Sequence, residues 1–295
     1  MKQTEQTSKP EYKSTCSSDC KKLVEIALNI GDVMLKHGAE TYRVEDTMRR
    51  ILSCSPCCQT GSQGPAGDTV SEAGYRDAYV TYTGIMVTLE LPGGETITKV
   101  KRIENGGANY NKLYLANNLS RKLCAGTISL EEAEGEIRRI RESRIYPEWV
   151  VGVSTVLIAA MFAVLFGGGL GDCLAAGLNG VFIIVARQLV GQKGRLQLPA
   201  FIETMLISLG MAYLTRLLLS GVELAGWPGS IDQGTVITSS IMPLVPGVAI
   251  TNAIRDTLQG DYMSGGSRAM EAFVTAAGIA VGIGIGLILF RIMLE

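Results

Sequence analysis

Five apolar segments in the second half of the chain constrain its fold more than any other feature of the sequence. Each is close to the roughly 20 residues that an α-helix needs to cross the hydrocarbon core of a bilayer. They cover residues 149–166, 171–190, 198–219, 234–254 and 269–291. The sequence therefore predicts a polytopic α-helical membrane protein with five spans.

Charged residues are concentrated in the first half of the chain. Residues 1–148 hold 20 Lys/Arg and 20 Asp/Glu, whereas residues 149–295 hold only 7 and 8. This contrast predicts three parts, a disordered polar tail (1–19), a cytoplasmic α+β domain (20–147) and a transmembrane domain (148–295). The tail has no apolar core and is not expected to be a signal peptide. A net charge of −1 gives no support for nucleic-acid binding.

Hydrophobic spacing predicts the elements of the cytoplasmic domain. A helical pattern covers residues 20–52, where Gly38 is expected to separate two helices. Alternating patterns then predict three strands, at residues 77–83, 85–91 and 96–103, with Gly84 at a bend or bulge. Helices are expected over 110–124 and from the capping box Ser129–Glu132 to residue 144.

Neither a metal site nor an enzymatic site is predicted. Cys54, Cys57 and Cys58 form half of a zinc-like pattern in a flexible loop at 53–75, but no second ligand pair follows, so reduced thiols are expected. His37 beside Gly38 is read either as a helix cap or as a proton carrier. The chain shows no phosphate loop, no Ser/His/Asp set and no paired ligands. No cofactor is therefore expected.

Basic residues alternate between the loops and set the orientation. RRIRESR at 138–144 precedes the first span, the second loop carries Arg187, Lys193 and Arg195, and the fourth carries Arg255 and Arg268. The first loop (167–171) and the third have no Lys or Arg. By the positive-inside rule, the protein is a multi-pass cell-membrane protein with a cytoplasmic N-terminus and an external C-terminus.

The fourth span is interrupted at PLVPG. Proline removes a backbone donor and glycine adds freedom, so a break is expected there, and transporters build binding sites at such breaks. Polar and ionisable residues follow the break. The predicted substrate-binding residues are Pro243, Pro246, Gly247, Asn252, Arg255 and Arg268. The alternative interpretation is a structural kink followed by an ordinary polar loop.

Acidic residues near or inside the spans are candidates for proton coupling. They are Asp256, Asp261 and Glu203; Glu203 is expected either to pair with a basic group of the fourth loop or to snorkel to the interface. Other polar residues either line a path or bond across helices: Asn179, Thr204, Ser208, Ser239 and Ser240. Glycines at 278–286 predict close helix packing, within the subunit or between subunits.

Three motifs closely resemble the threonine/serine exporter family. They are GAETYRVE (38–45), YTGIMVTL (82–89) and PLVPGVAITNAIRDTLQGDYMSGGSR (243–268). In the first two, the residues singled out are Gly38, Glu40, Tyr42, Arg43, Glu45, Thr83 and Gly84. The chain departs from the family where Tyr82 replaces a common proline and where the 53–75 loop is longer.

The resemblance implies a secondary exporter of small hydrophilic metabolites, namely threonine and serine or a small dicarboxylate such as succinate, driven by the proton gradient. Long members carry about ten spans, so this chain looks like the large subunit of a split form. A homo-oligomer, a small four-span partner, or both are expected. The alternative is a membrane-anchored enzyme or sensor whose cytoplasmic domain binds a metabolite. That alternative needs a catalytic constellation in residues 20–145, and the sequence offers none.

Overall fold

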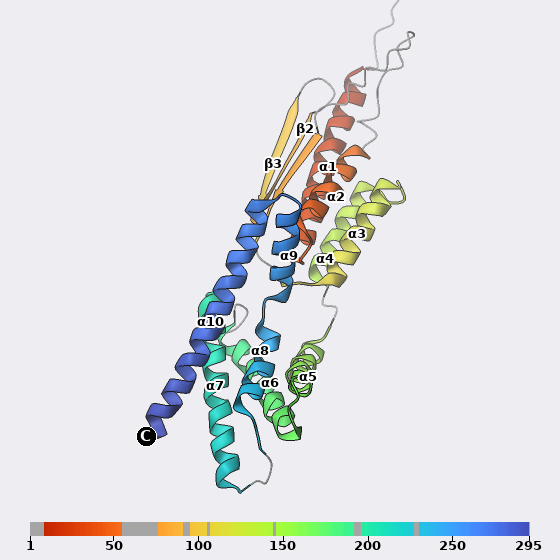
Figure 1. The fold of residues 1–295 in the computed structure, drawn as a ribbon. Coiled ribbons are helices and arrows are strands. Elements are labelled where there is room, and N and C mark those ends of the chain that lie inside the picture. Colours follow the sequence, from red (N-terminus) through yellow and green to blue (C-terminus); the bar gives the residue numbers. More distant parts are fainter. Residues whose placement is uncertain are drawn as a thin grey trace, which may run out of the picture. The chain divides into compact units, whose positions relative to one another are not determined.

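The computed structural model describes residues 9–54, 76–90, 95–104, 107–143, 146–191, 196, 198–226 and 230–294. The chain divides into two compact units, coloured along the sequence in Figure 1. The first comprises Met1–Ser143 and Thr251–Arg268, and the second comprises Arg144–Ile250 and Ala269–Glu295. The sequence predicts one boundary between residues 147 and 148, and in this division Thr251–Arg268 also belong to the first unit.

Helices and a three-stranded sheet make up the first unit. Its elements are α1 (Lys9–Lys36), α2 (Thr41–Ser53), β1 (Arg76–Thr81), β2 (Gly84–Glu90), β3 (Thr96–Arg102), α3 (Tyr110–Cys124), α4 (Leu130–Glu142), most of α9 (Gly247–Leu258) and the first turns of α10 (Tyr262–Leu294). The α+β character predicted for the N-terminal part is confirmed. The rest of the Gly/Cys-rich loop, from residue 55 to residue 75, lies outside the described residues.

The sheet is antiparallel in the order β1-β2-β3. Ile85, Val87 and Leu89 alternate along β2 and are buried in the core of the unit. Gly84 pairs with Thr81 directly after a two-residue turn, and the ladder continues without interruption. Gly84 therefore begins a strand directly after a tight hairpin turn, so of the two expected alternatives the chain bends here and forms no bulge.

The N-terminal helix is longer than the sequence predicts. It begins at Lys9, so residues 9–19, which were expected to belong to a disordered tail, are helical. It ends at Lys36, and Gly38 adopts a left-handed φ of 93° that a side chain with a Cβ atom rarely accepts. This glycine separates the helix from α2, as predicted.

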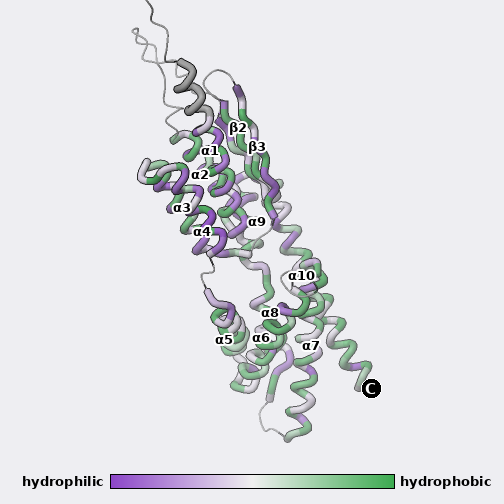
Figure 2. The backbone as a smooth tube through the Cα atoms, turned by 180° about the vertical axis from the view of Figure 1, so that it is seen from behind, coloured by the Kyte–Doolittle hydropathy of each residue, from purple (hydrophilic) through white to green (hydrophobic). Residues whose placement is uncertain are grey.

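The second unit consists of apolar helices. They are α5 (Glu148–Leu165), α6 (Leu170–Val190), α7 (Ala200–Leu224), α8 (Gln233–Ile241), the short 3₁₀ turn η2 (Met242–Leu244), and the greater part of α10. Among the described residues, four helices are long and apolar enough to cross a membrane: α5, α6, α7 and α10. Their apolar character is clear in Figure 2, where most of their length is coloured hydrophobic.

The predicted break in the fourth span is confirmed. The segments Gln233–Leu244 and Gly247–Leu258 together are apolar enough to span, but they meet at a bend of 61°. Pro243 lies in the 3₁₀ turn, and Pro246 directly precedes the helix that starts at Gly247. Counting this bent pair as one span gives five, the number expected from the sequence.

Close packing in the second unit depends on glycine. A Cβ atom added at Gly180 on α6 would lie 2.8 Å from the Cα of Val156 on α5. On α10, Gly282 and Gly286 face backbone atoms of α7 at a similarly short range. The small residues of the last span therefore let it pack against α7 within the same chain.

Candidate functional site

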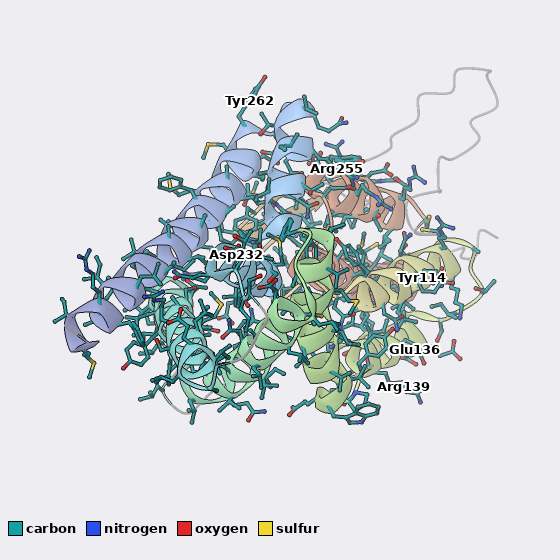
Figure 3. The ribbon with its side chains drawn as sticks, turned by 60° about the horizontal axis from the view of Figure 1, so that its bottom comes forward. Tyr114, Glu136, Arg139, Asp232, Arg255 and Tyr262 are labelled. Atoms are coloured by element: carbon teal, nitrogen blue, oxygen red, sulfur yellow. The ribbon has the colours of Figure 1, made fainter. Side chains whose placement is uncertain are left out.

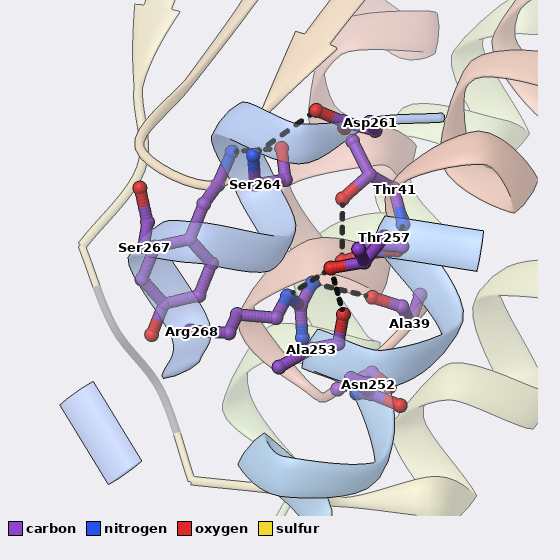
Figure 4. A network of polar contacts seen from close by, with 12 residues as sticks. Ala39, Thr41, Asn252, Ala253, Thr257, Asp261, Ser264, Ser267 and Arg268 are labelled. Carbon is purple, nitrogen blue, oxygen red and sulfur yellow. Dashed lines mark hydrogen bonds and ion pairs between the residues drawn. The ribbon is translucent and has the colours of Figure 1, made fainter. Parts of the chain in front are cut away.

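A buried ion pair lies at the centre of the polar network in the first unit (Figure 4). Arg268 of α10 places Nε 3.0 Å from Oδ2 of Asp256 on α9, and both side chains are at most 4% exposed. Arg268 also donates from Nη2 to the carbonyl oxygen of Ala39, over 2.9 Å. Such a pair is stable only when both charges have partners, because burying a lone ion costs several kcal/mol.

The carboxylate of Asp256 also anchors the first turn of α2. Its Oδ1 accepts a hydrogen bond from the backbone N–H of Thr41 over 3.1 Å, and Oδ2 accepts one from the Thr41 hydroxyl over 3.2 Å. The first N–H groups of a helix have no partner within the helix, and the helix dipole favours an anion at this end. Asp256 therefore supplies from α9 the N-terminal cap that Glu40, at the N-cap position, does not supply.

The segment between α1 and α2 is held by two further residues of α9. Asn252 donates from Nδ2 to the carbonyl oxygen of Gly38 over 3.0 Å. Arg255 forms an ion pair with the nearly buried carboxylate of Glu40, which Arg43 approaches at 3.5 Å. The side chain of Arg255 remains 58% exposed (Figure 3). The GAET motif and the segment after the PLVPG break therefore meet at one place.

The motif YTGIMVTL (82–89), which begins in the turn between β1 and β2, joins the same network through α10. Ser264 accepts a hydrogen bond at its hydroxyl from the backbone N–H of Tyr82, over 3.2 Å. The guanidinium carbon of Arg268 lies 5.0 Å from the centre of the Tyr82 ring, which is within cation–π range. Asp261 caps α10 by accepting from the backbone N–H of Ser264 over 3.0 Å. The ring of Tyr82 thus contacts the buried arginine.

Glycine permits the approach of α9 and α10. A Cβ atom at Gly265 would lie 3.0 Å from the carbonyl oxygen of Ala253 and would clash with the hydroxyl of Thr257. That hydroxyl donates to the same carbonyl over 2.8 Å. The Asp256–Arg268 pair therefore depends on a glycine at this crossing.

The remaining residues of the motifs GAETYRVE and YTGIMVTL also belong to the first unit. Tyr42 is exposed, and the carbonyl oxygen of Thr83 accepts from the backbone N–H of Ile103 over 2.9 Å. Glu45 pairs with Arg49 at 2.8 Å. Burial raises the pKa of Glu45, Arg49 lowers it, and Asp77 and Asp261 raise it further.

His37 lies just after α1, and its Nδ1 is 3.2 Å from the carbonyl oxygen of Gly107. Burial is the largest influence on this ring and lowers its pKa, and nearby Lys112 and Lys36 act in the same direction. A lowered pKa favours the neutral imidazole at pH 7. The ring therefore links the end of α1 to the segment that precedes α3.

The other predicted site residues belong to the second unit. Pro243, Pro246 and Gly247 form the break described above. The carboxylate of Glu203 lies in the first turn of α7 beside Gly191, and no hydrogen bond or ion pair links it to any residue that the structure describes. The partner expected for it from the fourth loop is not found, because Arg255 pairs with Glu40 and Arg268 pairs with Asp256.

Sequence reasoning missed Thr41, the carbonyl oxygen of Ala39 and the Tyr82 ring. The sequence did hold one local signal for Thr41. A helix start needs a side-chain acceptor for its first N–H groups, and Glu40, at the N-cap position, is not one of the preferred N-cap residues, so the acceptor has to come from elsewhere in the chain. Within the described ranges, no group of three or more His, Cys, Asp or Glu residues is placed to hold a metal ion.

These features define a polytopic membrane protein with a folded polar unit, and the comparisons identify its family. The family model ThrE, described as "Putative threonine/serine exporter", matches residues 69–290. The chain therefore belongs to this family. It is 23% identical over 278 residues to a protein of Corynebacterium glutamicum named "Threonine/serine exporter". That match covers 92% of this chain but only 52% of the relative, so the chain spans about half of that protein's length.

A second relative is closer in length. The chain is 21% identical over 261 residues to the Escherichia coli K12 protein named "Probable succinate transporter subunit YjjP", covering 88% of this chain and 92% of that protein. No solved structure gives a significant match. The family and these relatives are transporters and not enzymes, so the chain is assigned to a transporter family.

Proposed function

We propose that the chain is a proton-coupled secondary exporter of small hydrophilic metabolites, either threonine and serine or a small dicarboxylate such as succinate. Membership of the ThrE family and the names of the two relatives support this proposal. The membrane-spanning helices of the second unit supply the permeation path.

The observation that carries the proposal is the buried Asp256–Arg268 pair. It joins α9 and α10, two helices that both continue into the second unit. Asp256 is the acid that we assign to the coupling proton. When it is protonated, Arg268 loses its counter-ion and Thr41 loses a charged acceptor. A buried arginine cannot stay unpaired without cost, so protonation favours a rearrangement of both helices.

We assign the contact with the solute carboxylate to Arg255. Arg268 is buried with all its described partners inside the unit, whereas Arg255 is half-exposed and holds Glu40 with only part of its guanidinium. A guanidinium can hold a carboxylate through two parallel hydrogen bonds, and a lysine ammonium cannot.

The experiment compares export by wild type, Arg255→Lys and Asp256→Asn in cells, with each rate normalised to membrane abundance. We expect both variants to insert normally and to lose at least about tenfold in export, since each removes one charge-assisted interaction. Arg139→Lys is the matched control, because Arg139 is 81% exposed and its one ion pair with a described residue is to Glu136 on α4 (Figure 3). Normal export by both variants at normal abundance would overturn the site assignment.

We further propose that the chain works as a homo-oligomer, with a small four-span subunit, or both. The word "subunit" in the name of the Escherichia coli relative supports a partner, as does the half-length match to the Corynebacterium protein. Efflux is therefore measured with the chain alone and with any small membrane protein encoded beside it. A detergent-solubilised monomer that transports on reconstitution would contradict this part of the proposal.

The proposed orientation has a cytoplasmic N-terminus and an external C-terminus. Five spans and the alternation of basic loops support it. A reporter that is active only outside the cytoplasm, fused after residue 295, is expected to give a signal. A signal from the cytoplasmic reporter instead would indicate an even number of spans.

A further inference from the structure

Three polar side chains meet inside the apolar second unit. Asn179 of α6 donates from Nδ2 to the hydroxyl of Thr215 on α7 over 2.8 Å, and to the hydroxyl of Ser240 on α8 over 3.0 Å. All three residues are completely buried. Ser240 directly precedes Ile241 and the 3₁₀ turn of the broken span. The polar cluster is therefore next to the break in the membrane helix.

The protons available in this cluster fix the orientation of the amide. The Thr215 hydroxyl donates its single proton to the carbonyl oxygen of Met211 over 2.9 Å, and the Ser240 hydroxyl donates to that of Val236 over 2.6 Å. Both hydroxyls can then only accept from Asn179, which requires the NH₂ group to face them. Oδ1 must point the other way. It is buried and has no hydrogen-bond partner among the described residues.

An unpartnered amide oxygen in this setting needs an explanation. Leaving a buried acceptor without a donor costs about 1–3 kcal/mol, and the core of a bilayer supplies no bulk water to compensate. An apolar residue would avoid this cost, so the structure retains an acceptor that its own residues do not use.

Ser208 is a second polar group of this kind. It is completely buried on α7, and its hydroxyl has no hydrogen-bond partner in the part of the chain that the structure describes. It precedes Thr215 by two helical turns and therefore lies on the same face of α7. An acceptor at Asn179 and a hydroxyl at Ser208 are thus both left over on the helices that form this buried region.

We propose that Oδ1 of Asn179 accepts a hydrogen bond from the transported solute, which therefore carries a donor group, an ammonium or a hydroxyl. This inference rests on the proposed export function and narrows its substrate class. A hydroxy amino acid offers both kinds of donor. A fully ionised dicarboxylate offers only acceptors, which an amide oxygen cannot bind. Asn179 is thus a specificity-determining residue that favours amino acids over succinate.

Asn179→Leu tests the inference because leucine removes the unused acceptor and introduces no polar side-chain atom of its own. Thr215 and Ser240 keep their bonds to backbone carbonyls, so we expect an unchanged or higher apparent melting temperature. Efflux of labelled serine or threonine is expected to fall about tenfold or more, by loss of a hydrogen bond to a charged donor. A merely structural asparagine would lose stability together with export.

Ser239→Ala is the matched control. Ser239 is completely buried on the same helix as Ser240, but its hydroxyl donates to the carbonyl oxygens of Thr235 and Val236 and does not contact Asn179. Efflux of labelled serine or threonine by Ser239→Ala is expected to equal that of wild type. Wild-type efflux by Asn179→Leu would overturn the inference and leave the export function standing. Absence of efflux of serine, threonine and succinate by wild type would overturn the export function itself.

A binding measurement keeps the inference testable if Asn179→Leu does not fold. Serine and threonine at millimolar concentration are expected to raise the apparent melting temperature of the purified wild-type protein, because a ligand that binds only the folded state stabilises it. Succinate at the same concentration and ionic strength is expected to give no increase. Protection by succinate and not by the amino acids would overturn the assignment of a donor-bearing solute.

Discussion

The two buried polar networks of this protein differ in charge and in how completely they are satisfied. In the first unit, both oxygens of Asp256 have partners, supplied by Thr41 and Arg268. In the second unit, Asn179 uses both of its N–H groups and leaves its oxygen unused. A buried ion without partners costs several kcal/mol, whereas a neutral amide oxygen costs less. An unused acceptor in the neutral network therefore costs less than an unpaired ion would cost in the charged one.

The largest effect is expected from breaking the charged network. Arg268→Met removes the counter-ion and leaves Asp256 buried without its cation, which costs about 3–5 kcal/mol. The measurement is the apparent melting temperature in detergent, with Arg139→Met as the exposed control. If the melting temperature of Arg268→Met is no lower than that of the control, the ion pair does not stabilise the first unit. The two networks would then not differ in their contribution to stability.

A matched pair of substitutions sharpens the comparison. Thr41→Val and Thr215→Val each remove one buried hydroxyl with little change of shape. The first loses a hydrogen bond to a carboxylate, worth about 1.5–3 kcal/mol. The second loses one from a neutral amide, worth about 0.5–1.5 kcal/mol, together with the bond within α7 from its hydroxyl to the carbonyl oxygen of Met211. Thr41→Val is therefore expected to melt earlier than Thr215→Val, and the reverse order would show that charge does not distinguish the networks.

The smallest effect concerns Glu45, at the border of the charged network, whose pKa is raised mainly by burial. A raised pKa means that the folded state holds the proton more tightly than the unfolded chain, so stability falls as pH rises from about the ordinary value of 4.5 to the folded value. At pH values well above the folded pKa, this contribution of Glu45 to the stability is fully lost. At pH 7, Glu45→Gln is expected to have a slightly higher melting temperature than wild type.

Melting curves of both proteins between pH 4 and pH 8 provide the check for Glu45. The advantage of Glu45→Gln is expected to shrink as the pH approaches 4, where the glutamate is protonated in both states. An advantage of equal size at every pH would mean that the ionisation of Glu45 has no part in it.

Local patterns predicted the elements that depend on neighbouring residues. The helix Tyr110–Cys124 agrees at both ends with the sequence prediction, and the Ser129–Glu132 capping box is present as expected. The break at PLVPG also follows from its own residues, since proline and glycine disrupt a helix wherever the segment lies. Residues 9–19 were expected to belong to a tail because they are polar, whereas the helix begins at Lys9. Extending an existing helix costs far less than starting one, so the apolar turns that follow can support them.

The contacts of the candidate site could not be predicted from local patterns. Asp256 and Thr41 are 215 residues apart in the chain, and neither has a neighbour that indicates the other. The charge of Asp256 and Arg268 suggested solute and proton chemistry, and their burial against each other emerges only in the folded unit. The amide orientation at Asn179 likewise depends on carbonyls of two other helices, which no spacing in its own segment reveals.

The return of residues Thr251–Arg268 to the first unit has a consequence for biosynthesis. Residues 1–143 leave the ribosome first, but the cap for Thr41 and the donor to Ala39 arrive only with Asp256 and Arg268. At translation rates of about 5–20 residues per second, the N-terminal part waits on the order of ten seconds for them. During that interval the apolar segments between residues 144 and 250 are synthesised. The first unit can therefore reach its final form only after most of the apolar segments have been made.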